Sequence, residues 1–253
     1  MPAKQKISKK RADAVLFESG LVESVREAAA RIMSGKVMYT DHDGKERKLQ
    51  KPGDSIYVGS SFRFAGAKHP YVSRGGLKLA AALDNFPLEI DGKTCLDVGI
   101  STGGFTDGLL RAGAKKVYGV DVGYGQTAWK IRTDPRVTLF ERTNIKNLKP
   151  TVFEEPIDLL VIDVSFISLS GLLPKLKTFL GNNASMICLI KPQFELPANQ
   201  VPSGGVVRDT AAHKRAIDKV LLAAAESHLQ SNGIVPSPIK GADGNTEYLV
   251  WLQ

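Results

Sequence analysis

The stretch LDVGISTGGFTD, residues 96–107, has the composition of a nucleotide-binding loop. An apolar run ends in Asp97 and Val98, and the pair Gly103-Gly104 opens a helical pattern. Glycine is favoured where the backbone must lie against a ligand or take a positive φ. The spacing Gly-x-x-x-Gly-Gly lacks the dinucleotide fingerprint Gly-x-Gly-x-x-Gly, and no Gly-Lys-Ser/Thr follows as it does in a phosphate loop. An ordinary strand-helix turn is the alternative interpretation.

Asp97 indicates which ligand the loop binds. A carboxylate is unfavourable beside a pyrophosphate, but it suits the amino group and the sulfonium of S-adenosylmethionine. Asp121 ends the next strand, where an acid accepts hydrogen bonds from ribose hydroxyls, although a surface acid is also common there. We therefore predict S-adenosylmethionine as the cofactor. The residues predicted to bind it are Asp97, Gly99, Ser101, Thr102, Gly103, Gly104, Phe105, Asp121, Val122 and, against the adenine edge, Asn144.

Charged side chains interrupt or end other apolar stretches. Asp163 follows the apolar run in IDLLVIDVSFIS, and Lys191 follows the one in MICLIKPQFE. A lysine at the end of a buried strand is costly unless it has a purpose. Because parallel strands end at one edge of a sheet, we expect Asp163 and Lys191 to lie close together. Lys78 interrupts SRGGLKLAAAL, where a surface lysine is the alternative, and Glu247 lies in GNTEYLVW.

The elements that must position these residues alternate between strands and helices. A helix capped by Ser73 is predicted to end before Pro87. Apolar runs follow at 94–98, 116–122, 137–140, 157–163, 184–190, 234–235 and 248–252, with helical stretches at 104–112, 126–132, 168–180 and 209–230. This order predicts an α/β fold with a doubly wound, mostly parallel, seven-stranded sheet and a ligand beyond the carboxyl ends of its strands.

A small basic α+β domain is predicted ahead of this sheet, over residues 1–64. This part of the chain holds 13 Lys and Arg against 8 Asp and Glu, and the whole chain carries a net charge of +8. One helix capped by Ser8 ends at Gly20, a second follows Ser24 and ends at Gly35, and the strands KVMYT and SIYV come next. A linker at 65–72 joins this domain to a second one at 73–253. The excess positive charge favours an anionic partner, RNA first.

The segment KKRADAVLFESGLVESVREAAARIMSGKV resembles the S-four RNA-binding domain. In that family the basic face of the helices binds structured RNA. The resemblance implies that RNA is bound by Lys9, Lys10, Arg11, Arg26, Arg31 and Lys36. A solvated pair of charged helices is the alternative interpretation of the same pattern.

Nearly the whole chain resembles the TlyA family, whose members are labelled both as haemolysins and as ribosomal RNA methyltransferases. The matching motifs are SRGGLKL, LDVGISTGGFTD, GVDVGYGQ, DVSFIS, LIKPQFE and GNTEYL. The resemblance implies a Rossmann-like class I methyltransferase fold and the tetrad of FtsJ-type ribose 2′-O-methyltransferases, Lys78, Asp163, Lys191 and Glu247. It also implies ribosomal RNA or ribosomal subunits as the partner, with a cytidine as the target. Ile100 stands where the family often has a small residue, and it could narrow the cofactor loop.

The chemistry of this reaction gives each member of the tetrad a role. A ribose hydroxyl is a poor acid, so a base must take its proton before the oxygen attacks the methyl group. We assign Lys191 as the base, with Lys78 as the neighbouring cation that, with burial, favours its neutral form. Asp163 and Glu247 hold the two lysines. The remaining catalysis is in-line alignment of oxygen, methyl carbon and sulfur, and it requires no metal.

The composition of the chain limits the other functional interpretations. Both cysteines lie in apolar runs, which fits reduced thiols in the cytoplasm, and the four histidines are too scattered for a zinc site. A nicotinamide oxidoreductase would need the missing glycine fingerprint, and a haemolysin acting on membranes would need an apolar or amphipathic segment that is not visible. A non-catalytic RNA-binding protein stays possible. We expect residues 195–206 to form a flexible lid or substrate loop.

Overall fold

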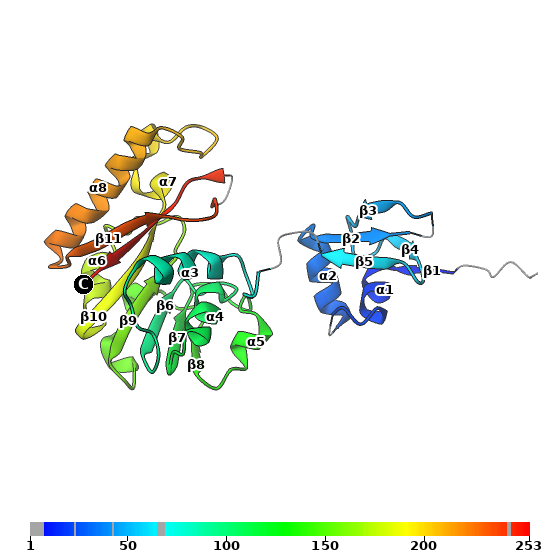
Figure 1. Cartoon of the computed structure of the whole chain (residues 1–253), viewed down its shortest axis with the longest axis horizontal. Helices are drawn as coiled ribbons and strands as arrows, with labels where there is room; N and C mark the ends of the chain where they lie inside the picture. Colours follow the sequence, from blue (N-terminus) through cyan, green and yellow to red (C-terminus); the bar gives the residue numbers. More distant parts are fainter. Residues whose placement is uncertain (1–7, 23, 42, 65–68, 242–243) are drawn as a thin grey trace, which may run out of the picture. The chain divides into compact units, whose positions relative to one another are not determined.

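The chain forms two compact units, residues 1–68 and 69–253, which we call the N-terminal and the C-terminal unit. The computed structural model describes residues 8–22, 24–41, 43–64, 69–241 and 244–253 (Figure 1). Each unit has a hydrophobic core of its own.

In the N-terminal unit two helices pack with two small sheets. The helices are α1 (Ala12–Glu18) and α2 (Val25–Met33). Strand β1 (Lys9–Arg11) pairs with β4 (Ser55–Tyr57), and β2 (Val37–Thr40) lies between β3 (Glu46–Lys48) and β5 (Ser61–Phe64). Apolar side chains from both helices, among them Leu16 and Ile32, meet Val37, Leu49 and Ile56 in the core.

The starts of the two helices test the capping predictions. Ser24 caps α2 as predicted, because its hydroxyl accepts a hydrogen bond from the N–H of Glu27. The prediction that Ser8 caps α1 is wrong. Residues 9–11 are extended because they pair with β4, and α1 begins only at Ala12.

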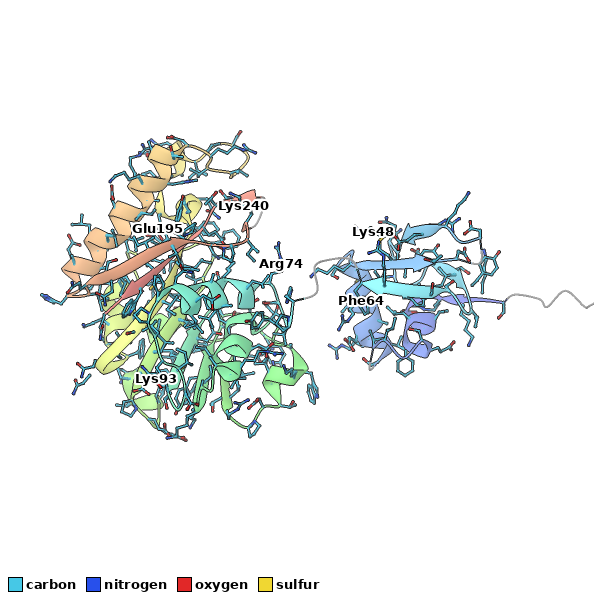
Figure 2. All side chains as sticks on the ribbon, viewed as in Figure 1. Lys48, Phe64, Arg74, Lys93, Glu195 and Lys240 are labelled. Carbon is cyan, nitrogen blue, oxygen red and sulfur yellow. The ribbon has the colours of Figure 1, made fainter. Side chains whose placement is uncertain are left out.

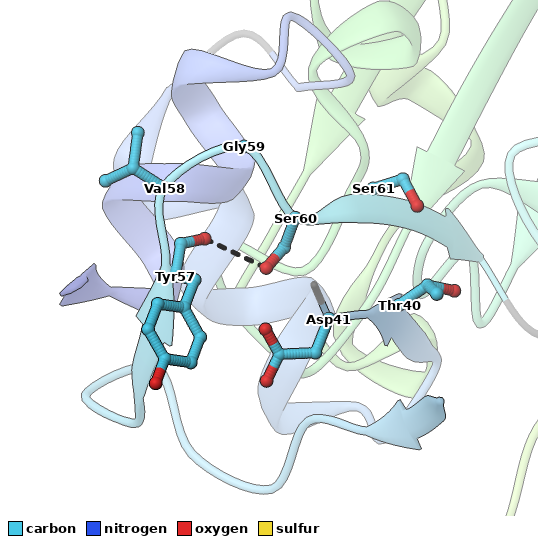
Figure 3. Close-up of a pocket in the computed structure, with 7 residues that line it drawn as sticks. All are labelled: Thr40, Asp41, Tyr57, Val58, Gly59, Ser60 and Ser61. Carbon is cyan, nitrogen blue, oxygen red and sulfur yellow. Dashed lines mark hydrogen bonds between the residues drawn. The ribbon is translucent and has the colours of Figure 1, made fainter. Parts of the chain in front are cut away.

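A hollow in the N-terminal unit lies between the end of β2 and the β4–β5 turn (Figure 3). It has a volume of about 320 Å³ and is lined by Thr40, Asp41, Tyr57, Val58, Gly59, Ser60 and Ser61. The hydroxyl of Ser60 donates to the carbonyl of Tyr57 and closes the turn. Because an aspartate and no lysine or arginine lines it, this hollow does not suit an anionic ligand.

A seven-stranded sheet forms the centre of the C-terminal unit, in the order β11-β12-β10-β9-β6-β7-β8. Its strands are β6 (Thr94–Val98), β7 (Lys116–Val120), β8 (Val137–Phe140), β9 (Ile157–Ile162), β10 (Leu180–Ile190), β11 (Ser231–Pro236) and β12 (Tyr248–Leu252). Five neighbouring strands, β10 to β8 in this order, pair in parallel, and β12 is antiparallel to both of its neighbours. The predicted mostly parallel sheet is confirmed.

Helices cover both faces of this sheet. They are α3 (Gly75–Asn85), α4 (Gly104–Arg111), α5 (Trp129–Arg132), α6 (Leu173–Lys177), α7 (Pro192–Glu195) and α8 (Thr210–Glu226), with 3₁₀ turns at Ile145–Asn147, Pro150–Val152 and Ala198–Gln200. In β9, Leu159 and Val161 pack with α3, α4 and α5, whereas Leu160 and Ile162 pack with α6 and α8. This alternation follows from the two-residue period of a strand.

Three helix predictions need correction. The helix predicted at 126–132 is a single turn that begins at Trp129, because the two residues before it bind the glycine loop. The hydroxyl of Thr127 donates to the carbonyl of Ser101, and the N–H of Ala128 donates to the carbonyl of Thr102. The one predicted at 168–180 shrinks to Leu173–Lys177, since β10 already begins at Leu180. Ser73 binds the N–H of Gly75, but Arg74 is the residue at the N-cap of α3.

Among the residues that the structure describes, no helix combines the length and the apolar composition needed to cross a membrane.

Candidate active site

Four charged side chains from distant parts of the sequence meet at one edge of the sheet. Asp163 bridges the two lysines, since its Oδ1 lies 2.6 Å from Lys191 Nζ and its Oδ2 lies 3.2 Å from Lys78 Nζ. Glu247 Oε2 lies 2.8 Å from Lys78 Nζ, a close ion pair without the angles of a hydrogen bond. The structure therefore brings together all four residues predicted to form the tetrad.

The topology explains why these residues meet. Asp163 directly follows β9 and Lys191 directly follows β10, and the two strands are parallel neighbours in register at Ile162 and Cys188. Glu247 directly precedes β12, which runs antiparallel to β10, so the start of β12 lies beside the end of β10. Lys78 reaches the same place from the first turns of α3.

The tetrad is a buried but charge-balanced cluster. The exposed fraction of the side chain is 10% for Lys78, 9% for Lys191, 2% for Glu247 and 21% for Asp163. Two cations and two anions at such depth are tolerated because each charge has a partner that offsets the loss of hydration. Asp163, which pairs with both lysines, is the most exposed of the four side chains, so the cluster is open to solvent at Asp163.

The glycine loop approaches this cluster closely. Gly99 and Gly103 have φ values of +84° and +93°, which side chains rarely adopt. A Cβ atom at Gly99 would lie 2.5 Å from the carbonyl oxygen of Asp163. The same loop also carries Ser101 in the left-handed region, with φ +47°. The loop predicted to bind the cofactor is thus adjacent to the residue that links the two lysines.

Asp97 has the environment expected for a residue that binds a cationic ligand. It is only 1% exposed, and its Oδ2 accepts a hydrogen bond of 2.6 Å from the hydroxyl of Thr106. Its Oδ1 has no hydrogen-bond partner in the described part of the chain. Burial raises the pKa of Asp97 to about 7. The ammonium group of S-adenosylmethionine would satisfy the unpartnered oxygen and stabilise the charge, so the residue fits this cofactor.

Asp121 is held in place by the backbone around it. Its Oδ2 accepts the N–H of Ser101 at 2.8 Å and its Oδ1 accepts the N–H of Gly123 at 2.7 Å. A carboxylate has about four acceptor positions, so two remain for ribose hydroxyls. Val122 beside it is 71% exposed. Asn144 caps the 3₁₀ turn at Ile145–Asn147 through the N–H of Lys146, which gives it a structural role whether or not it contacts adenine.

The two large apolar residues of the loop belong to the core. Ile100 is 3% exposed and packs over Gly119, where a side chain would collide with it. Its side chain therefore lies in the core between helix and sheet instead of narrowing the loop. Phe105 is 4% exposed and packs against Gly75 of α3.

Three residues around the site were not predicted from the sequence. Thr106 binds Asp97, and Ser165 Oγ lies 3.0 Å from Lys191 Nζ. Phe166 is 91% exposed, has a φ of +64° and lies 5.2 Å, centroid to centroid, from the ring of Phe194. The motif DVSFIS contains both Ser165 and Phe166, but no spacing rule distinguishes them from ordinary loop residues.

A buried glutamate fixes the loop that carries Ser165 and Phe166. Glu195, labelled in Figure 2, is 1% exposed and accepts hydrogen bonds from the hydroxyl of Ser168 and the N–H of Leu169. Lys219 of α8 donates to the carbonyl of Glu195 at 2.6 Å. These contacts join the loop after β9 to the short helix after β10.

Residues 195–206, predicted as a flexible lid, include the 3₁₀ turn Ala198–Gln200 and are anchored at their far end. The amide of Asn245 donates to the carbonyl of Gly205 and accepts the N–H of Val207, each at 3.0 Å. Asn245 is two residues from Glu247. This segment is therefore tied to the same stretch of chain that brings Glu247 into the tetrad.

The six cations predicted to bind RNA are all exposed on the N-terminal unit, but Lys9, Lys10 and Arg11 lie on a strand and not on a helix. Three of the six form ion pairs: Lys10 with Glu18, Arg11 with Asp13 and Arg31 with Glu27. Lys9 lies over the ring of Tyr57 and Arg31 over that of Phe64. Arg26 and Lys36 are the remaining two of the six predicted cations. Exposure is compatible with RNA binding, and the ion pairs reduce the net positive charge of this surface.

Comparisons with known proteins show the family of this chain. The family model of FtsJ-like methyltransferases matches residues 71–253. The 16S/23S rRNA (cytidine-2′-O)-methyltransferase TlyA of Mycobacterium tuberculosis is 42% identical over 96% of this chain and 89% of its own length. Hemolysin A of Brachyspira hyodysenteriae is 38% identical over 94% of this chain and 98% of its own.

A solved structure from Streptococcus thermophilus, provisionally named a hemolysin, is 39% identical and superposes with a TM-score of 0.74. It covers 97% of this chain and 88% of its own. Both the match to the family model and the similarity to these relatives extend over the residues that build the site. The chain belongs to the FtsJ-like methyltransferase family and, within it, to the TlyA/hemolysin A proteins.

Proposed function

We propose that this protein is an S-adenosylmethionine-dependent methyltransferase that methylates the 2′-hydroxyl of a cytidine in ribosomal RNA. The observation that carries the proposal is the Lys78–Asp163–Lys191–Glu247 cluster beside the glycine loop. The names of the relatives supply the finer detail, since three of them are cytidine-2′-O-methyltransferases of ribosomal RNA.

The residues of the chain divide the work of this reaction. S-adenosylmethionine supplies the methyl group. Asp97 would hold the ammonium group of the cofactor and Asp121 would hold its ribose. Lys191 would take the proton of the 2′-hydroxyl, which leaves the ribose oxygen free to accept the methyl group that the cofactor supplies. Lys78 provides the second positive charge, held by Asp163 and Glu247.

The target nucleotide needs a surface to hold it against Lys191. Phe166 is three residues from Asp163, one residue from Ser165 and almost fully exposed. Aromatic side chains of this kind stack on unpaired bases, and each stacked base contributes about 1–3 kcal/mol. We assign Phe166, supported by Phe194, as the stacking partner of the target base.

The N-terminal unit supplies the remaining contact with RNA in this proposal. Residues 1–64 resemble the S-four RNA-binding domain and carry most of the excess positive charge. In this proposal the region 65–72 links them to the methyltransferase domain at 73–253. Phosphate contacts from Lys9, Lys10, Arg11, Arg26, Arg31 and Lys36 would hold ribosomal RNA or a ribosomal subunit. A ribosomal substrate places the enzyme in the cytoplasm.

Methyl transfer from labelled S-adenosylmethionine to isolated ribosomal subunits tests the proposal. We expect label in RNA, recovered as 2′-O-methylcytidine after nuclease digestion. Lys191→Ala should abolish incorporation, while Lys214→Ala, a surface variant on α8 whose ammonium pairs with Asp218, serves as the control. Label on a base instead of a ribose, or full activity of Lys191→Ala, would contradict the assignment.

A further inference from the structure

We propose that Ser165 is a positioning residue that directs the lone pair of Lys191 toward the ribose hydroxyl. The inference rests on the function proposed above and adds Ser165 to the residues of the proposed active site. It begins from the surroundings of the Lys191 amine, which donates a hydrogen bond to Ser165 Oγ at 3.0 Å and forms an ion pair with Asp163 Oδ1 at 2.6 Å.

The Lys191 side chain has little freedom except rotation of its amine. It is 9% exposed, and its Nζ lies 5.9 Å from the centroid of the Phe194 ring. The base form of lysine has two N–H bonds and one lone pair in a tetrahedral arrangement. A single acceptor fixes only one N–H, so the lone pair can still occupy either of two positions by rotation about the Cε–Nζ bond.

The carboxylate of Asp163 removes this choice. Ser165 accepts one N–H, and a lone pair that faced the negative charge of Asp163 at 2.6 Å would be repelled, so the lone pair takes the remaining direction. Both residues come from the loop after β9, which also carries Phe166. The same loop therefore orients the base and presents the surface on which we place the target nucleotide. Orientation of a reacting group before the reaction raises kcat and does not require tighter substrate binding.

The contacts of Ser165 point to this role and not to a structural one. Ser165 is exposed, and in the described part of the chain its hydroxyl has one hydrogen-bond partner, Lys191. The buried contacts that hold the loop are made by Ser168 and Leu169 with Glu195. Loss of the Ser165 hydroxyl should leave the loop in place.

Ser165→Thr and Ser165→Val form a matched pair for the test, because threonine and valine have nearly the same shape and differ in the hydroxyl. Steady-state and single-turnover methyl transfer to ribosomal RNA would be measured for the full chain and both variants. We expect kcat of the valine variant to fall about tenfold below that of the threonine variant, the effect of one lost hydrogen bond in the transition state. The KM for RNA and the Kd for S-adenosylmethionine should be the same in both.

The outcomes separate this inference from the proposed function. If the unmodified protein transfers no methyl group to ribosomal RNA, the proposed function fails, and this inference fails with it. If the unmodified protein is active, equal kcat values for the two variants overturn the role of Ser165 alone. A difference confined to KM also overturns it. Equal melting temperatures of the two variants show that both are folded.

Discussion

The carboxylate of Asp97 is buried, and one of its oxygens has no hydrogen-bond partner among the described residues, so we expect cofactor binding to depend on pH. Its pKa of about 7 means that a proton neutralises it at mildly acid pH. Because the neutral form cannot pair with the ammonium group of S-adenosylmethionine, we expect the affinity to fall as the pH drops through 7. Calorimetry at pH 6 and pH 8 would measure this. Asp97→Asn should bind weakly at both values, and a strong pH dependence in that variant would contradict the assignment.

The same residue should make the cofactor-free protein less stable at high pH. The folded-state pKa is raised from 3.8 to about 7, so the folded protein binds the proton more tightly than the unfolded chain does. Stability is therefore highest below pH 4 for this group alone and is lost as the pH rises through 7. At pH 8 we expect Asp97→Asn to raise the melting temperature of the cofactor-free protein by several degrees while it abolishes cofactor binding. A higher melting temperature combined with the loss of cofactor binding would indicate that Asp97 serves function at a cost in stability.

At the scale of elements, the packing of α3 on α4 positions Lys78. A Cβ atom at Gly104 would collide with Ser73 Oγ and would lie 2.9 Å from the backbone nitrogen of Gly76. We expect Gly104→Ala to separate the helices, to reduce stability by about 1–3 kcal/mol and to lower kcat by displacing Lys78. Thermal unfolding and methyl transfer measure the two effects. Gly204→Ala is the control, because a Cβ atom at Gly204 would have no neighbour within 4 Å among the described residues and the φ angle there is not positive. An equal effect in both variants would contradict this account.

The sequence predicted those elements whose own composition determines them. Apolar runs located all seven strands of the C-terminal unit, and because parallel strands share an edge they also placed Asp163 beside Lys191. The elements that were missed depend on distant partners. Residues 9–11 are extended only because they pair with β4, and Thr127 and Ala128 lie outside the helix because they bind the glycine loop. For the same reason the contact between Ser165 and Lys191 follows from the fold and not from any spacing.

At the scale of the whole molecule, the two units differ in charge and in the chemistry they carry. The tetrad and the predicted cofactor residues all lie in the C-terminal unit, whereas residues 1–64 hold 13 Lys and Arg against 8 Asp and Glu. Each unit has its own core, so neither needs the other to bury its apolar side chains. Cofactor binding and the electrostatic part of RNA binding should therefore be separable.

We expect residues 69–253 alone to bind S-adenosylmethionine with nearly the affinity of the full chain and to bind ribosomal RNA much more weakly. Each phosphate contact that is lost should also reduce the slope of log K against log salt by about 0.7–0.9. Titrations at several salt concentrations would measure this slope for the full chain and for the fragment. Arg26→Glu with Lys36→Glu in the full chain should shift the slope in the same direction, with cofactor affinity unchanged. Equal losses of RNA and cofactor affinity in the fragment would contradict this division, because the N-terminal unit would then act on the methyltransferase unit itself and not through RNA phosphates.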